Sequence, residues 1–333
     1  MRFQHSTTAG GDQEVAYEEF WRPMETRLNS VMPEFLRHYG MRNGKNVRKG
    51  DIYTACKFDI EKAKDVDAVK IHLSAMSSAA LSYQKFISPE EEVDPRVSRR
   101  LQGILELDST VSYPLLIRIF KDWKDDVISI DQVIQCLDLL ESFYVRRLVC
   151  GVPTNALNKI TLELCLAYQE SNVQHWLQEK IQNGSGTRRC PNDEEFEQNL
   201  IVQRIYPRRR IARYMLLALE ESFKHKEPVD TSSATMEHIM PQTLTDSWRS
   251  ELGEKHSEIH DAWLDTIGNL TLTGYNAELG NASFSDKKEK LQNTHFELSR
   301  GLLSEDSWGA SQIEARGKAL AKLALRRWSL VLP

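Results

Sequence analysis

The 333-residue sequence lacks the features that mark membrane, secreted and zinc-stapled proteins. No apolar run approaches the roughly 20 residues of a membrane-spanning helix, and the polar N-terminus lacks the apolar core of a secretory signal. We therefore expect a cytoplasmic protein without a membrane partner. The five cysteines include no C-x-x-C pair, which argues against a disulfide framework and a structural zinc site, so we expect buried thiols.

The chain also lacks a net positive charge: its formal charge is −5 at pH 7. This total does not exclude nucleic-acid binding, because phosphates are met by local basic patches. Arg208, Arg209 and Arg210 form one such patch, and we expect them to contact DNA phosphates without reading the base sequence. An exposed basic helix start or an ion-paired helix face explains the same run equally well.

Strand-like alternation is scarce in the first half of the chain. Residues 12–183 show apolar positions at helical spacing, with breakers such as Gly151-Val152-Pro153 between segments. A short flexible linker follows at residues 183–187. The sequence therefore predicts a helical domain over residues 1–183 and a second domain over residues 184–333.

The second domain contains two short strand candidates, residues 234–237 and residues 270–273. Helical pieces lie between them, and a further helix is predicted over residues 285–291 with a serine cap. Strand, long loop, strand and helix is the outline of a ββα metal-binding finger. The expected fold is mainly α, with a helical domain followed by a ββα-metal core that helices surround.

Five residues of this outline could together form a hydrolytic site. Hydrolysis of a phosphodiester needs an activated water and a cation for the charge that develops on the phosphate. Imidazole titrates near neutral pH, so His238 is suited as the general base, while Glu237 on the opposite strand face offers Mg²⁺ a hard oxygen ligand. Of Asn269 and Asn276, one could ligate the metal and the other could orient the imidazole or tie down the loop. Lys287 is expected to contact a phosphate oxygen.

Each of these residues also has a plainer interpretation. An isolated Glu-His pair usually lies at the protein surface and has no functional role. Asn269 is also typical of a turn, Asn276 of a helix cap and Lys287 of a solvated side chain. His256 and His260 have the spacing of half a zinc site, but no nearby cysteine completes it.

Several separated motifs, taken in order, resemble the C-terminal HNH-type (His-Me finger) domain of GmrSD-like restriction endonucleases. They are Glu237-His238-Ile239-Met240-Pro241-Gln242-Thr243-Leu244, Trp248, Ile267-Gly268-Asn269-Leu270-Thr271-Leu272, Asn276, Asn281, Phe284 and Lys287, with Trp308, Ile313 and Arg316 in the closing pattern. The resemblance covers roughly residues 190–330. The segments Phe20–Glu25 and Arg146–Asn155 resemble the middle region of such proteins.

The resemblance implies a bacterial DNA endonuclease that uses Mg²⁺, with Mn²⁺ as an alternative cation. It implies that His238 is the catalytic base, Asn269 the middle residue of the HNH triad, and Glu237 and Asn276 the metal ligands. Relatives cut phage DNA that carries modified bases or phosphorothioate linkages, so such DNA is the expected partner. Family members usually begin with an NTP-binding, ParB-like domain marked by D-G-Q-Q-R. That signature is absent, so we expect a companion domain elsewhere in a longer protein or on a separate subunit.

Our leading hypothesis is an endonuclease or nickase module of a modification-dependent anti-phage restriction system. The alternative is a DNA-binding or regulatory module whose finger no longer cuts. A third hypothesis makes the helical half mainly an interface to the NTP-binding domain. An oligomer is compatible with all three.

Overall fold

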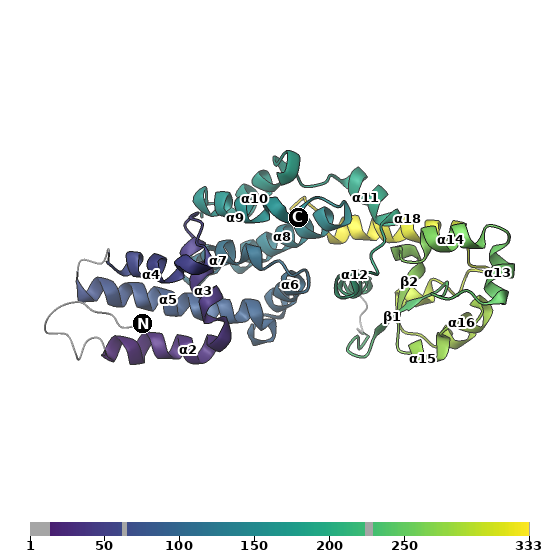
Figure 1. Ribbon diagram of the computed structural model, residues 1–333, viewed down its shortest axis with the longest axis horizontal. Coiled ribbons are helices and arrows are strands. Elements are labelled where there is room, and N and C mark those ends of the chain that lie inside the picture. The colour runs from purple at the N-terminus through teal and green to yellow at the C-terminus, as the bar shows by residue number, and fades with distance from the viewer. Residues whose placement is uncertain (1–13, 62–64, 224–228, 333) are drawn as a thin grey trace. The chain divides into compact units, whose positions relative to one another are not determined.

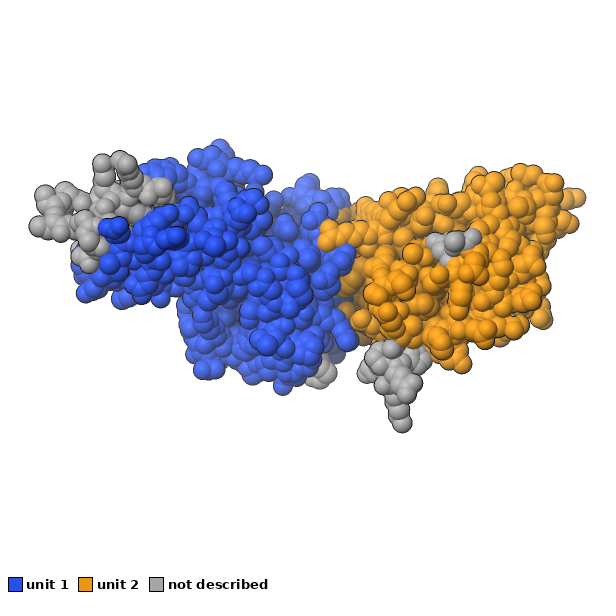
Figure 2. Space-filling view, turned by 90° about the horizontal axis from the view of Figure 1, so that it is seen from below, with its two compact units in different colours: residues 1–141, 153–189, 331–333 blue, residues 142–152, 190–330 orange. Residues whose placement is uncertain are grey.

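The computed structural model describes residues 14–61, 65–223 and 229–332 (Figure 1). The chain divides into two compact units, coloured separately in Figure 2. Unit 1 comprises residues 1–141, 153–189 and 331–333, and unit 2 comprises residues 142–152 and 190–330. Helices dominate both units, which confirms the prediction of a mainly α fold. The segment 142–152 belongs to unit 2, although the sequence placed it in the helical domain.

Unit 1 contains a succession of helices, as predicted for residues 12–183. They are the π-helix η1 (Tyr17–Trp21), α2 (Arg22–Leu28), α3 (Met32–Met41), α4 (Ile52–Glu61), α5 (Val66–Ile87), α6 (Pro95–Glu106), α7 (Tyr113–Lys124), α9 (Leu157–Leu166) and α10 (Val173–Gln182), together with the first part of α8 (Ile130–Val149). Two of these helices begin with a side-chain cap. The Asp65 and Asp94 side chains accept backbone N–H groups at the starts of α5 and α6.

An aromatic cluster fills the core of unit 1. The rings of Phe35, Tyr83 and Tyr113 meet edge to face, with centroid distances of 5.2 Å from Phe35 to Tyr83 and 5.4 Å from Tyr83 to Tyr113. His38 is buried among them, and its Nδ1 lies 2.9 Å from the Tyr83 hydroxyl. Burial lowers the pKa of His38 from 6.5 to about 4, and the charge of Arg37 adds to this effect.

Unit 2 surrounds a small sheet with helices. Its elements are α11 (Asp193–Val202), α12 (Arg209–Glu221), β1 (Thr235–His238), α13 (Asp246–Leu252), α14 (His256–Trp263), β2 (Leu270–Thr273), α15 (Asn276–Leu279), α16 (Phe284–Leu291), α17 (Glu297–Arg300) and α18 (Ala310–Arg327). Short 3₁₀ turns join elements of both units: η2 (Asn29–Val31), η3 (Lys49–Asp51), η4 (Pro89–Glu91), η5 (Thr110–Ser112), η6 (Thr154–Ala156), η7 (Gly186–Arg188) and η8 (Ile267–Asn269).

The two strands pair antiparallel, with His238 opposite Leu270 and Thr235 opposite Thr273. β2 has the predicted bounds, whereas β1 lies one residue further along the chain than predicted. α16 follows, beginning at Phe284 with the Ser283 hydroxyl accepting the Asp286 N–H. The predicted outline of strand, long loop with helical pieces, strand and helix is therefore present.

Buried tryptophans anchor the core beside the sheet. Trp248 donates its indole N–H to the Ala282 carbonyl at 2.9 Å, and Trp308 stacks on Phe284 with centroids 5.3 Å apart. Both indoles are buried, and so is Trp328, while Trp263 is only partly buried. Three of these four tryptophans are thus core anchors.

The remaining expectations concern membranes and cysteines. None of the helices in the described ranges is long and apolar enough to span a bilayer. None of the five cysteines, all of which are described, forms a disulfide, and Cys56, Cys136 and Cys165 are buried. Burial raises the pKa of the Cys165 thiol to about 12, so this cysteine is chemically inert at neutral pH.

Candidate active site

The last two residues of β1 project to opposite faces of the strand. Glu237 is buried, and its Oε1 accepts a hydrogen bond from Lys287 Nζ at 2.5 Å. The same ammonium donates to the His238 carbonyl oxygen at 2.7 Å. Lys287 comes from α16 and is 1% exposed, so it ties the helix to the strand rather than standing free at the surface. Its predicted contact with a DNA phosphate would require the ammonium to leave these partners.

The His238 imidazole lies on the other side of β1, against a segment distant in sequence. Its Nε2 is 3.3 Å from Asp265 Oδ1, and both side chains are buried. Asp265 Oδ2 accepts from Arg204 at 2.8 Å, and the Tyr206 ring meets the imidazole edge with centroids 4.2 Å apart. Asp265 and Tyr206 therefore contact the imidazole directly, and Arg204 pairs with the Asp265 carboxylate.

Asn269 has no hydrogen-bonding capacity to spare for a metal or a substrate. Its Oδ1 accepts the Met240 N–H at 2.8 Å and the Trp308 indole N–H at 3.0 Å. Its Nδ2 donates to the carbonyl oxygens of Met240 and Leu264, each at 2.9 Å. All four positions of the amide are used. Of the roles open to Asn269 from sequence, the geometry selects the one that ties down the loop after His238.

The segment around Asn269 is held closely against α18. A Cβ on Gly268 would lie 2.2 Å from the Ile313 carbonyl oxygen, so only glycine fits at this position. Arg316 donates to the carbonyl oxygens of Gly268 and Leu270, each at 2.8 Å. These contacts explain why the Ile-Gly-Asn-Leu motif, Ile313 and Arg316 occur together: they fix one loop.

Burial is the main influence on the ionisable groups of the site. It lowers the pKa of His238 from 6.5, although the hydrogen bond and charge of Asp265 oppose the shift. The imidazole is therefore neutral at neutral pH. Burial also raises the pKa of Glu237 against the pull of Lys287, and lowers that of Lys287 against the pull of Glu237. Both shifts arise because two charges are removed from water.

The described residues offer a cation few ligands. No group of three or more His, Cys, Asp or Glu side chains within the described ranges could hold a metal ion. Lys287 takes Oε1 of Glu237, which leaves Oε2 as the oxygen this carboxylate can offer. Asn276, the second predicted ligand, begins α15, but its side chain lies outside the described residues. A single carboxylate oxygen supplemented by waters and substrate phosphate fits the sparse coordination that Mg²⁺ accepts.

The arginine run lies at the start of α12, next to the wall of the imidazole site. Arg208, Arg209 and Arg210 are exposed. They place positive charge at a helix N-terminus, where the helix dipole favours anions instead. The Arg209 guanidinium lies 5.2 Å from the centroid of the Tyr206 ring, which in turn contacts His238. The predicted DNA contacts and the predicted base are thus neighbours in space.

His256 and His260 do not form a metal site. His260 Nε2 lies 3.0 Å from the Pro241 carbonyl oxygen, and His256 Nδ1 lies 3.1 Å from the Ser257 hydroxyl. The two rings use different neighbours, and His260 helps to hold the turn after β1.

Sequence reasoning missed three residues that contact or support the imidazole. Asp265 stands two residues before the Ile-Gly-Asn-Leu motif, and this closeness to the motif could have indicated that Asp265 belongs to the site. Arg204 and Tyr206 stand near the arginine run, but nothing in the sequence shows that Tyr206 contacts His238 or that Arg204 pairs with Asp265. Their placement depends on an isolated β-bridge between Arg204 and Thr266.

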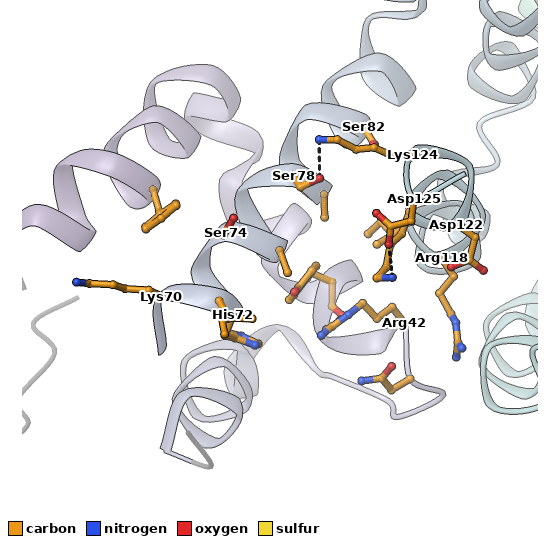
Figure 3. A pocket seen from close by; sticks show the side chains of 18 of the residues that line it. Arg42, Lys70, His72, Ser74, Ser78, Ser82, Arg118, Asp122, Lys124 and Asp125 are labelled. Atoms are coloured by element: carbon orange, nitrogen blue, oxygen red, sulfur yellow. Dashed lines mark hydrogen bonds and ion pairs between the residues drawn. The ribbon is translucent and has the colours of Figure 1, made fainter. Parts of the chain in front are cut away.

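Unit 1 has a pocket of its own, with a volume of about 1060 Å³ (Figure 3). Ser74, Ser78 and other small residues of α5 line it, beside charged side chains of α7. Lys124 donates to the Ser78 hydroxyl at 2.7 Å, and Lys121 pairs with Asp125 at 2.6 Å. Every residue predicted for catalysis or DNA contact belongs to unit 2, so this pocket is no part of the site.

Comparison with known proteins agrees with the motif resemblance. Residues 190–323 match the family described as GmrSD restriction endonucleases, C-terminal domain. The matched range includes both strands, η8, α16 and the arginine run. No curated protein matches the chain.

Proposed function

We propose that residues 190–323, which form a C-terminal domain of the GmrSD restriction endonuclease family, are a metal-dependent DNA endonuclease or nickase module. The observation that carries this proposal is the environment of the His238 imidazole. Its Nε2 contacts the Asp265 carboxylate, whereas its Nδ1 has no hydrogen-bond partner among the described residues. A neutral imidazole held in one orientation is suited to general-base activation of water. We assign the two strands and α16 to a ββα-metal core of the HNH type.

His238 accepts the proton of the attacking water through Nδ1 in this proposal. Asn269 has a supporting role, because its four hydrogen bonds fix the loop that follows the base. The reaction is hydrolysis, so the water oxygen bonds to phosphorus and the departing sugar oxygen takes up a proton.

Glu237 and Asn276 are the residues we propose to hold Mg²⁺ or Mn²⁺. The bound cation would neutralise charge that develops on the phosphate. The donor type supports this proposal, since a carboxylate oxygen is a hard ligand and Glu237 retains one oxygen that Lys287 does not bond.

DNA binding is assigned to the exposed Arg208, Arg209 and Arg210. Positive charge at exposed positions near the base supports a role in holding the phosphate backbone, a contact that carries no sequence information. Modified phage DNA is the proposed substrate, and a separate NTP-binding domain is the proposed partner. The cytoplasm of a bacterium is the proposed location.

Cleavage of supercoiled plasmid tests this function. Ordinary DNA, base-modified DNA and phosphorothioate DNA are incubated with the chain and Mg²⁺ or Mn²⁺, and matched samples receive EDTA. We expect nicked or linear product only with the metal. Intact plasmid in every metal-containing sample, or cleavage that EDTA does not change, contradicts the proposal.

One observation favours a second candidate, a DNA-binding module that does not cut. The Lys287 ammonium bonds the carboxylate proposed as metal ligand, which reduces what Glu237 can offer a cation. In this case the chain retards DNA in a gel shift, but plasmid stays intact with every metal.

A further inference from the structure

Asp265 contacts the proposed base, but neither the family motif nor the proposed reaction assigns this residue a role. One carboxylate oxygen faces His238 Nε2 at 3.3 Å, and the other accepts from Arg204 Nη2 at 2.8 Å and Nε at 3.3 Å. Only 8% of the Asp265 side chain is exposed. A buried carboxylate with both oxygens engaged by named partners has a defined orientation.

The backbone around Asp265 is anchored independently of its side chain. Its carbonyl oxygen accepts the N–H groups of Ile205 at 3.0 Å and Tyr206 at 3.4 Å. Arg204 also forms a β-bridge with Thr266. Replacing the carboxylate by an amide of the same shape therefore leaves the main-chain contacts in place.

The contact with Asp265 determines which nitrogen of His238 carries the proton. A carboxylate paired with a guanidinium accepts hydrogen bonds and has none to donate. Because the carboxylate oxygen only accepts, Nε2 must carry the hydrogen of this contact, and Nδ1 is the ring nitrogen that can offer a lone pair. No described residue hydrogen-bonds Nδ1, so this nitrogen is free to meet a water.

We propose that Asp265 is the positioning residue of His238: it keeps the imidazole proton on Nε2 and aims Nδ1 at the attacking water, while Arg204 holds the carboxylate in place. This inference rests on the proposed function for its catalytic meaning. The orientation itself is a property of the protein without DNA or metal. It can therefore be measured even if the domain does not cut.

The direct test is ¹⁵N NMR of the full chain labelled at histidine, recorded near neutral pH. The His238 signals are identified by their loss in His238→Gln. Wild type is expected to show the Nε2–H tautomer. Asp265→Asn presents an amide that can donate to Nε2, so the proton should move to Nδ1, as the same substitution does in a Ser-His-Asp triad. Unchanged Nε2–H signals in a folded Asp265→Asn variant overturn the proposal.

A plasmid assay adds the functional readout. Asp265→Asn should lower the cleavage rate by about 10–100-fold with little change in DNA affinity. Asp261→Asn removes a carboxylate from an exposed position on α14 and is the matched control, with both tautomer and rate unchanged. Arg204→Gln, which keeps Asp265, should lower the rate less than Asp265→Asn.

The outcomes separate this inference from the proposed function. A tautomer change in Asp265→Asn together with inactive wild type supports the positioning and rejects the nuclease. Active wild type with an unchanged tautomer and an unchanged rate in Asp265→Asn rejects the positioning and keeps the nuclease. Loss of cleavage with an unchanged tautomer also rejects it, because the effect then does not pass through the imidazole proton.

Discussion

The Lys287 ammonium lies 2.5 Å from the Glu237 carboxylate, and both side chains are buried in unit 2. A buried ion pair is costly to break, because removing one partner leaves the other charged and without compensation. The pair therefore links the stability of the sheet to the group proposed as metal ligand.

Lys287→Met should lower the free energy of unfolding of unit 2 by about 3–5 kcal/mol. Adding Glu237→Gln to this variant should recover part of the loss, because no buried charge then remains. Urea denaturation followed by tryptophan fluorescence measures both effects. Lys290→Met, at an exposed position of the same helix, is the control and should change stability little. Equal losses for Lys287→Met and Lys290→Met would show that the pair is not a structural element.

Asn269→Ala should destabilise unit 2 by about 2–5 kcal/mol. The substitution leaves the Met240 N–H and the Trp308 indole N–H buried without their acceptor. Thermal unfolding monitored by circular dichroism measures the loss. Asn281→Ala, at an exposed position, is the matched control. A stable Asn269→Ala variant that still loses cleavage would instead assign the residue a direct part in the reaction.

Arg208→Ala combined with Arg209→Ala should weaken DNA binding without altering the fold. Each lost phosphate contact should also reduce the slope of log affinity against log salt by about 0.9 on duplex DNA. Fluorescence anisotropy at several salt concentrations gives both quantities. Lys255→Ala with Lys318→Ala removes the same charge from exposed positions elsewhere in unit 2. If the two double variants lose affinity equally, only net charge matters and the run is not a contact surface.

His38 should make unit 1 less stable in mild acid. Its pKa is about 4 in the folded protein, below the usual 6.5, so the unfolded chain binds the proton more readily between these values. The contribution of His38 to the free energy of unfolding is fully present above pH 6.5. It falls as the pH drops toward 4, by roughly 3 kcal/mol in all. Denaturation at a series of pH values compares wild type with His38→Gln. The same slope in both proteins would exclude His38 as its source.

Local sequence patterns predicted much of the secondary structure but few of the residues that surround His238. Leu270–Thr273 alternates leucine with β-branched threonine, so the bounds of this strand could be predicted from the sequence. Asp265 and Tyr206 reach His238 through tertiary contacts between segments that no periodicity connects. Sequence order also could not tell that Lys287 would be buried against Glu237, because lysine at a helix start is usually solvated.

The most direct measurement of the central claim is single-turnover plasmid cleavage by wild type and His238→Ala, with and without added imidazole. If His238 activates the water, the variant should cut at least about 100-fold more slowly. Imidazole should restore part of the rate in the variant and leave wild type unchanged, with DNA affinity equal in both. Metal-dependent cleavage at the wild-type rate by His238→Ala would contradict the account.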